Sequence, residues 1–250
     1  MLAALLEMTP SGVEQVDGEG FVEYAIYGAP GELPVLPVGE AQVAGVQVQV
    51  SGREVAADWG ERWKRFHEPV LVGDRLFVRP PWSEPRPGTL DVVIDPGQAF
   101  GTGAHPTTRL CLELLLGLEQ TGSLADLGCG SGVVAIAAAK LGFGPVTALD
   151  NESAALEATR ANAHANEVEL ARIERLDLRE QAPPAAATVT ANLTGALLKR
   201  MAELLVERPD ALVVSGLLEE EADEVVAAFE PLRERRRLTL HGWSALLLSE

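Results

Sequence analysis

The sequence predicts an α/β protein in which a doubly wound, seven-stranded sheet follows a small, reduced α+β N-terminal domain. The first observation is that short apolar segments of strand length alternate with helical segments along most of the chain. The second is the segment 124–150, which runs from an apolar strand through a glycine-rich turn and a helix to a second strand that ends on Asp150. This is the order of a nucleotide-binding βαβ unit, so the larger domain is expected to be Rossmann-like.

Residues 1–57 form the expected small domain. They contain eight acidic residues and one basic residue, Arg53. Alternating patterns predict strands over residues 21–27 and 44–50. No catalytic constellation is present here, so we expect this domain to recognise a substrate.

Residues 58–90 are expected to connect the two domains. Asp58 can cap a helix over residues 59–67, in which aromatic residues recur at helical spacing. Gly73-Asp74 suits the turn of a hairpin. The prolines of residues 80–88 predict a stiff linker.

Residues 91–250 contain the alternating strands and helices of the large domain. A strand over residues 90–94 precedes the sheet. The sheet strands are expected over residues 124–127, 145–149, 168–176, 188–191, 211–214, 233–240 and 243–248, with the last antiparallel, and helices over 107–118, 133–141, 153–166, 194–206 and 219–229. Because ligands bind at the carboxyl ends of parallel strands, Gly128, Asp150 and Asn192 are expected to meet there.

The glycine-rich turn has the spacing D-x-G-x-G-x-G and begins at Asp126. Dinucleotide sites use G-x-G-x-x-G, and a carboxylate beside the turn would repel a pyrophosphate. It would suit the sulfonium and ammonium groups of S-adenosylmethionine. Gly128 and Gly130 let the backbone approach such a ligand, and Asp150 can accept hydrogen bonds from a ribose diol. The alternative is a tight turn with no ligand.

Three further residues near these strand ends have two interpretations each. His105, in the glycine-rich segment 95–108 that is expected to cover the methionine end of the donor, is a general base or a helix-entry residue. Asp177 accepts from the adenine amino group or is an exposed turn residue. Asn192 orients the N–H bonds of an attacking amine or is a turn residue after its strand.

Four blocks resemble the PrmA family of methyltransferases, which modify a large-subunit ribosomal protein. They are DPGQAFGTGAHPTTRLCL (95–112), DLGCGSGVVAIAAAKLG (126–142), ALD (148–150) and TANL (190–193). The resemblance covers about residues 58–250. It implies a class I methyltransferase domain that transfers methyl groups from S-adenosylmethionine to lysine ε-amino or N-terminal α-amino groups.

The resemblance also implies the roles of individual residues. Asn192, which the chemistry above makes the expected catalytic residue, is by this resemblance also a donor contact. Thr108, Gly128 and Asp150 are further donor contacts, and Phe100, Gly101, Thr102 and Gly103 surround the methyl group. The chain departs from the family at its N-terminal domain, which opens inside helix-like sequence and is shortened.

The composition limits the classes of partner that the protein is expected to bind. A net charge of −17 argues against direct nucleic-acid binding and favours a basic protein partner, although solubility alone also explains it. The sequence has no signal peptide and no apolar run of membrane-spanning length, and its two cysteines are expected to be reduced, so we expect a cytoplasmic protein. We also expect it to be a monomer and to need no metal. The alternatives are a methyltransferase for another protein lysine or a small amine, and a non-catalytic donor-binding module.

Overall fold

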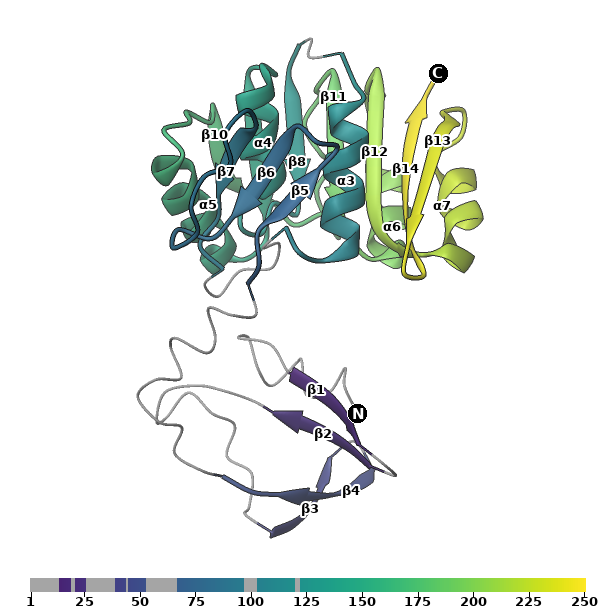
Figure 1. Cartoon of the computed structure of the whole chain (residues 1–250). Coiled ribbons are helices and arrows are strands. Elements are labelled where there is room, and N and C mark those ends of the chain that lie inside the picture. Colours follow the sequence, from purple (N-terminus) through teal and green to yellow (C-terminus); the bar gives the residue numbers. More distant parts are fainter. Residues whose placement is uncertain are drawn as a thin grey trace. The chain divides into compact units, whose positions relative to one another are not determined.

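The computed structural model describes residues 14–18, 21–25, 39–43, 45–52, 67–96, 103–119 and 122–250 (Figure 1). The chain divides into two compact units, Met1–Trp63 and Lys64–Glu250. Among the described residues, no helix is long and apolar enough to cross a membrane.

The smaller unit contains two antiparallel hairpins. In the first, β1 (Glu14–Gly18) pairs with β2 (Phe21–Ala25), and in the second, β3 (Gly39–Val43) pairs with β4 (Val46–Val50). The strands expected over residues 21–27 and 44–50 are present as β2 and β4. The helix expected over residues 59–67 lies, except for its last residue, outside the described residues.

The larger unit is built on a seven-stranded sheet, as predicted, with the strand order β10-β9-β8-β11-β12-β14-β13. Neighbouring strands from β10 to β12 are parallel, and β14 is antiparallel to both of its neighbours, which confirms the expected direction of the last strand. The strands are β8 (Leu124–Leu127), β9 (Val146–Asp150), β10 (Arg172–Arg175), β11 (Thr188–Asn192), β12 (Ala211–Leu218), β13 (Arg233–Leu240) and β14 (Trp243–Ser249).

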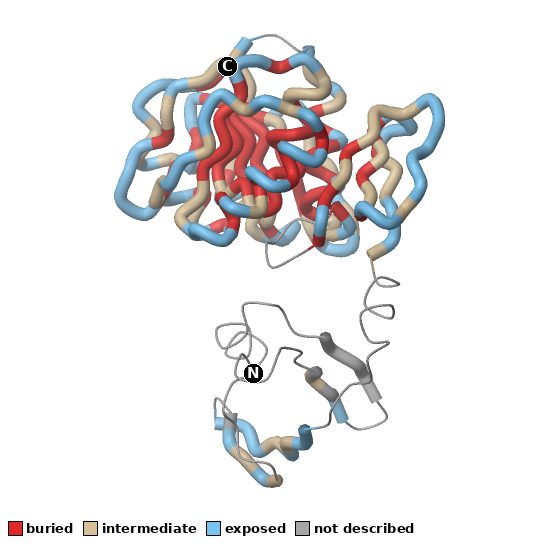
Figure 2. Tube along the Cα trace, turned by 90° about the vertical axis from the view of Figure 1, so that its left-hand side faces the viewer, coloured by how far each residue is buried: buried red, intermediate tan, exposed pale blue. Residues whose placement is uncertain are grey.

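Helices cover both faces of this sheet. One hydrophobic cluster joins it to α3 (Pro106–Leu116), α4 (Val133–Leu141) and α5 (Ser153–Ala165). A second cluster joins the opposite face to α6 (Gly195–Leu204) and α7 (Ala222–Ala228). Every residue of β8 is therefore buried, and Figure 2 shows the central strands as the most buried part of the unit.

A three-stranded sheet packs against the first of these clusters. It contains β5 (Val70–Val72), β6 (Leu76–Arg79) and β7 (Leu90–Val93). β5 and β6 form the hairpin predicted around Gly73-Asp74, whereas β6 and β7 are parallel. Parallel strands need a crossover connection, and the proline-rich stretch expected to be a linker supplies it. The hairpin thus belongs to the larger unit, because Val72, Leu76 and Val78 are buried in its core.

Three elements differ from the prediction by more than two residues at one end. The edge strand β10 is shorter than the expected 168–176, and the helix expected over 219–229 divides into a 3₁₀ turn, η1 (Glu219–Glu221), and α7. β12 extends beyond Val214, because a bulge at Gly216 (φ +87°) lets the strand continue to pair with β14. Glycine adopts this left-handed conformation without a steric penalty.

Candidate functional site

The glycine-rich turn connects β8 to α4 and closely approaches other parts of the fold. Gly128 (φ +73°), Gly130 (φ +53°) and Gly132 (φ +81°) all adopt left-handed conformations. A Cβ atom at Gly128 would lie 2.4 Å from the Leu193 side chain, and one at Gly132 would lie 2.8 Å from Thr159. The turn therefore requires glycine for both its conformation and its surroundings.

Asp150, at the carboxyl end of β9, is held beside this turn. The backbone N–H of Gly130 donates to Oδ2 of Asp150 at 3.0 Å, and that of Glu152 donates to Oδ1 at 3.0 Å. The structure thus brings together three residues that the sequence predicted for the donor site, Gly128, Gly130 and Asp150. Each carboxylate oxygen can accept a further hydrogen bond, as a ribose diol requires.

Asp126 also precedes the turn, but the contacts of its carboxylate are internal. The backbone N–H of Ala135 donates to Oδ2 at 3.2 Å, and the Thr190 hydroxyl donates to Oδ1 at 2.8 Å. Asp126 therefore ties β8 to α4 and β11, and a direct contact with the donor stays a prediction. Burial raises the pKa of this carboxyl to about 7.

The raised pKa of Asp126 predicts how stability depends on pH. Between the ordinary value, 3.8, and about 7, the unfolded chain loses this proton while the folded chain keeps it. Asp126 therefore contributes a fall in the free energy of unfolding as pH rises through this range. In Asp126→Asn, the amide replaces the protonated acid and does not titrate.

Urea denaturation of both proteins at about pH 5 and about pH 8 tests this prediction. From about pH 5 to about pH 8, the free energy of unfolding of the wild type is expected to fall by on the order of 1 kcal/mol or more relative to that of Asp126→Asn. A difference between the two proteins that stays constant with pH would contradict the raised pKa.

Asn192 ends β11, next to the turn that follows β8. β11 and β8 are parallel, and Ala191 lies opposite Leu127. The next residues, Asn192 and Gly128, therefore lie at the same edge of the sheet, where the two strands have their carboxyl ends. Nδ2 of Asn192 donates to the Thr108 hydroxyl at 3.4 Å, which joins two of the residues that the family resemblance implies. Within the described residues, Oδ1 of Asn192 accepts no hydrogen bond. It is therefore available as an acceptor.

The backbone after Asn192 is fixed by β12. The Leu193 N–H donates to the Ser215 carbonyl at 2.9 Å, and a Cβ atom at Gly216 would lie 2.4 Å from the Leu193 carbonyl oxygen. The Ser215 hydroxyl in turn donates to the Thr107 carbonyl at 3.0 Å. These contacts hold the end of β11 against β12, and β12 against α3.

The contacts of His105 favour helix entry and packing over general base catalysis. Its Nδ1 lies 2.8 Å from the Thr107 hydroxyl oxygen at the start of α3, and its ring meets Trp243 edge to face, with centroids 5.2 Å apart. Burial lowers the pKa of this imidazole.

The Asp177 carboxylate forms an ion pair within its own turn. The guanidinium of Arg179 donates to both carboxylate oxygens, at 2.8 and 2.7 Å, and its backbone N–H donates to Oδ1 at 3.0 Å. These hydrogen bonds lower the pKa of Asp177 to about 2. The geometry matches the alternative of a turn residue, and contact with an adenine amino group stays a prediction.

The segment around the expected methyl group is only partly described. Phe100, Gly101 and Thr102 lie outside the described residues. Gly103 is buried with φ +88°, and a Cβ atom there would lie 2.6 Å from the Val78 side chain. Gly103 thus fixes the entry to α3 against β6.

Two residues of α5 that the sequence analysis did not single out support the glycine-rich turn. The Thr159 hydroxyl donates to the Gly130 carbonyl at 3.0 Å, and Nδ2 of Asn162 donates to the Ser131 carbonyl at 2.9 Å. Both side chains are buried. Polar residues on the buried face of an amphipathic helix are the signal that could have identified them.

The sequence profile of a family described as "Ribosomal protein L11 methyltransferase (PrmA)" matches residues 37–249. Two curated relatives carry the name ribosomal protein L11 methyltransferase. The one from Shewanella pealeana is 43% identical over 177 residues, which cover 69% of this chain and 60% of the relative. The one from Cupriavidus necator is 40% identical over 209 residues, which cover 81% of this chain and 66% of the relative. The chain thus spans 60% to 66% of the length of these relatives.

Solved structures show the same fold. A ribosomal protein L11 methylase from Lactobacillus delbrueckii subsp. bulgaricus matches with a TM-score of 0.67 and 24% identity, covering 74% of this chain and 99% of that one. A Pyrococcus abyssi tRNA (uracil-54, C5)-methyltransferase, solved with S-adenosyl-L-homocysteine, matches with a TM-score of 0.50 and 23% identity, covering 65% of this chain and 43% of that one.

Proposed function

Since the chain belongs to the PrmA family of ribosomal protein L11 methyltransferases, we propose that it transfers methyl groups from S-adenosylmethionine to amino groups of ribosomal protein L11. The observation that carries this proposal is the pairing of β8 with β11, which places the glycine-rich turn and Asn192 at one edge of the sheet. A donor-binding turn and an amide acceptor are the two groups that amine methylation needs.

The residues present fit the donor. Gly128 and Gly130 give the turn its left-handed backbone, and Asp150 has acceptor capacity for the ribose hydroxyls. Thr108 lies beside Asn192, where it limits the positions open to the Asn192 amide. When bound, S-adenosylmethionine supplies an electrophilic methyl carbon attached to a sulfonium.

Asn192 acts on the attacking amine. A lysine ammonium ordinarily titrates near 10.4, so the site has to bind the neutral amine. Oδ1 of Asn192 accepts a hydrogen bond from an N–H of that amine and so directs the amine's lone pair toward the methyl carbon. Positioning of this kind supplies much of the rate, and no dedicated general base is required.

The substrate and its surroundings belong to the same proposal. The acidic charge of −17 supports a basic protein partner and disfavours direct contact with nucleic acid. Lysine ε-amino groups and the N-terminal α-amino group are both candidate acceptors. We further propose that the protein works as a cytoplasmic monomer.

Incubation with isotopically labelled S-adenosylmethionine and purified large-subunit ribosomal proteins tests the proposed function. We expect the label on L11, and peptide mass spectrometry then identifies the amino groups. Label on another protein or on a small amine would support the alternative of a methyltransferase with a different substrate. Donor binding without transfer to any acceptor would support the non-catalytic module.

Asp150→Ala tests the ribose assignment. Loss of the carboxylate removes the proposed acceptors and the bond from the Gly130 N–H, so the dissociation constant for S-adenosylhomocysteine should rise ~10-fold or more by calorimetry. Asp177→Ala, measured in the same way, tests the predicted contact between Asp177 and the adenine amino group. An unchanged dissociation constant in Asp150→Ala would refute the ribose contact.

A further inference from the structure

Three buried polar side chains lie along α5 and at its C-terminal cap: Thr159 and Asn162 in the helix, and Asn166 directly after it. Their spacing of three and four residues places them in a row along the helix. Buried amides need partners for both their oxygen and their nitrogen, so the contacts of this row show what it connects.

The N-terminal part of the row contacts the glycine-rich turn. Thr159 donates to the Gly130 carbonyl, and Nδ2 of Asn162 donates to the Ser131 carbonyl at 2.9 Å. These are consecutive carbonyl groups of the turn that is proposed to bind the donor. α5 therefore holds the turn in place through these two hydrogen bonds.

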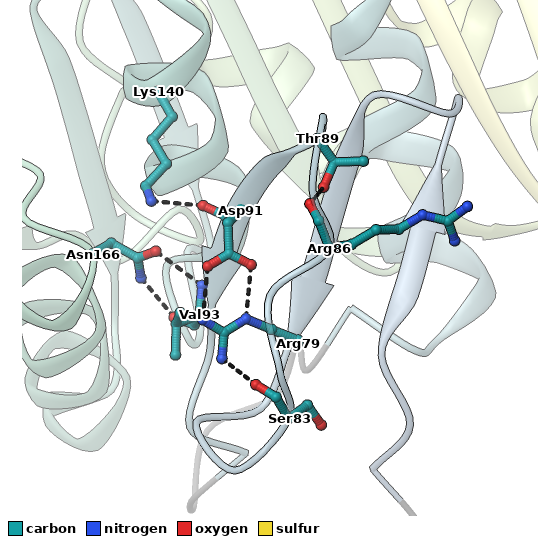
Figure 3. Close-up of polar contacts among 8 residues, drawn as sticks. All are labelled: Arg79, Ser83, Arg86, Thr89, Asp91, Val93, Lys140 and Asn166. Atoms are coloured by element: carbon teal, nitrogen blue, oxygen red, sulfur yellow. Dashed lines mark hydrogen bonds and ion pairs between the residues drawn. The ribbon is translucent and has the colours of Figure 1, made fainter.

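The C-terminal part of the row contacts β7. Oδ1 of Asn166 accepts the Val93 N–H at 2.9 Å, and its Nδ2 donates to the Val93 carbonyl at 2.6 Å, so this side chain imitates a neighbouring strand (Figure 3). Two further residues hold β7. Arg79 pairs with both carboxylate oxygens of Asp91, and Lys140 donates to the Asp91 carbonyl at 2.6 Å (Figure 3).

Asn162 contacts both parts. While its Nδ2 donates to Ser131, its Oδ1 accepts the Asp95 N–H at 3.0 Å. The orientation of the amide is fixed, because a flip would place oxygen against the Ser131 carbonyl and nitrogen against the Asp95 N–H. The amide of Asn162 thus joins the turn to the backbone just after the end of β7.

We infer that Asn162 is a positioning residue that couples donor binding at the glycine-rich turn to the order of the backbone at Asp95. The inference rests on the proposed function, because it takes the turn as the donor site. A ligand that holds Ser131 in place strengthens the orientation of the Asn162 amide, and this amide in turn holds Asp95. Because such coupling is reciprocal, loosening Asp95 weakens donor binding.

Hydrogen exchange at the Asp95 amide, followed by NMR with and without S-adenosylhomocysteine, tests the coupling. In the wild type, the ligand is expected to slow exchange ~10-fold. In Asn162→Leu, exchange should be faster and respond less than about twofold to saturating ligand, and the dissociation constant measured by calorimetry should rise ~5-fold.

Asn166→Leu is the matched control, because the Asn166 side chain contacts β7 and the Asn162 carbonyl but neither the turn nor the Asn162 amide group. It should lower thermal stability to a similar extent while keeping both the ligand response at Asp95 and the wild-type dissociation constant within about twofold. Asn162→Asp gives a second test if Asn162→Leu does not fold. It keeps the acceptor for Asp95 but loses the donor to Ser131, so Asp95 should stay protected without responding to ligand.

The outcomes separate the two proposals. A wild type that does not bind S-adenosylhomocysteine would remove the proposed function. A wild type that binds it, with an equal ligand response at Asp95 in the wild type and Asn162→Leu, would overturn the coupling alone. Equal effects of Asn162→Leu and Asn166→Leu on the dissociation constant would also overturn it, because a purely structural role predicts that result.

Discussion

Asn192→Ala is expected to reduce the rate of methyl transfer by ~100-fold or more while changing the dissociation constant for S-adenosylhomocysteine by less than about threefold. The reason is that Oδ1 of Asn192 is proposed to contact the amine, whereas the turn and Asp150 are proposed to hold the donor. Without the amide, the amine loses the acceptor that directs its lone pair. Single-turnover transfer from labelled donor to L11, together with calorimetry, measures the two quantities separately.

Thr108→Val is the companion variant for this prediction. It removes the hydroxyl that accepts from Nδ2 of Asn192 at 3.4 Å but keeps the amide itself. We expect a smaller loss, ~10-fold, because the amide is present but less well oriented. Transfer rates in Asn192→Ala equal to those of the wild type would remove this residue from the mechanism. A dissociation constant that rises as much as the rate falls would assign it to donor binding instead.

Gly216→Ala is expected to lower the free energy of unfolding by ~3 kcal/mol and to reduce methyl transfer in whatever protein folds. The new Cβ atom would lie 2.4 Å from the Leu193 carbonyl oxygen, and the residue would adopt φ +87°. The clash is with backbone, so no side-chain rotation relieves it. The end of β11, and Asn192 with it, has to move.

Gly88→Ala separates the clash from the backbone conformation. Gly88 has φ +80°, but no atom lies within 4 Å of a Cβ atom built there. It should therefore lose only the ~1 kcal/mol that a left-handed non-glycine residue costs. Urea denaturation of both variants gives the comparison. Equal losses would show that the contact between Gly216 and Leu193 does not constrain the site.

The glycine-rich turn and the strand ends around it show how far the sequence leads. A strand, three glycines, a helix and a terminal acid occur in succession, so local conformational preference and hydrophobic periodicity predict the βαβ unit. Chain order and the parallel connections then place Gly128, Asp150 and Asn192 at one edge of the sheet. The alternation of strands and helices predicts a doubly wound sheet, and the final hairpin predicts its antiparallel last strand.

Side-chain partners required the tertiary structure. Asp126 was expected beside a cationic ligand because its position next to the turn is visible in the sequence, but the direction of its carboxylate depends on Thr190, which lies 64 residues away. Similarly, the proline-rich stretch before β7 has a linker composition. It acts as a crossover because Val78 and Val92 pack into the core of the larger unit.

By itself, the sequence determined that this protein contains a doubly wound sheet with a donor-type turn and an amide at the end of the fourth strand. Only the tertiary structure determined that Asp126 is internal, that Asp177 pairs with Arg179, and that Asn162 joins Ser131 to Asp95 across separations of 31 and 67 residues. The physical reason is that periodicity records which face of an element is buried. Which buried polar groups meet depends on how distant elements pack, and hydrogen bonds form only between atoms that packing brings within about 3 Å.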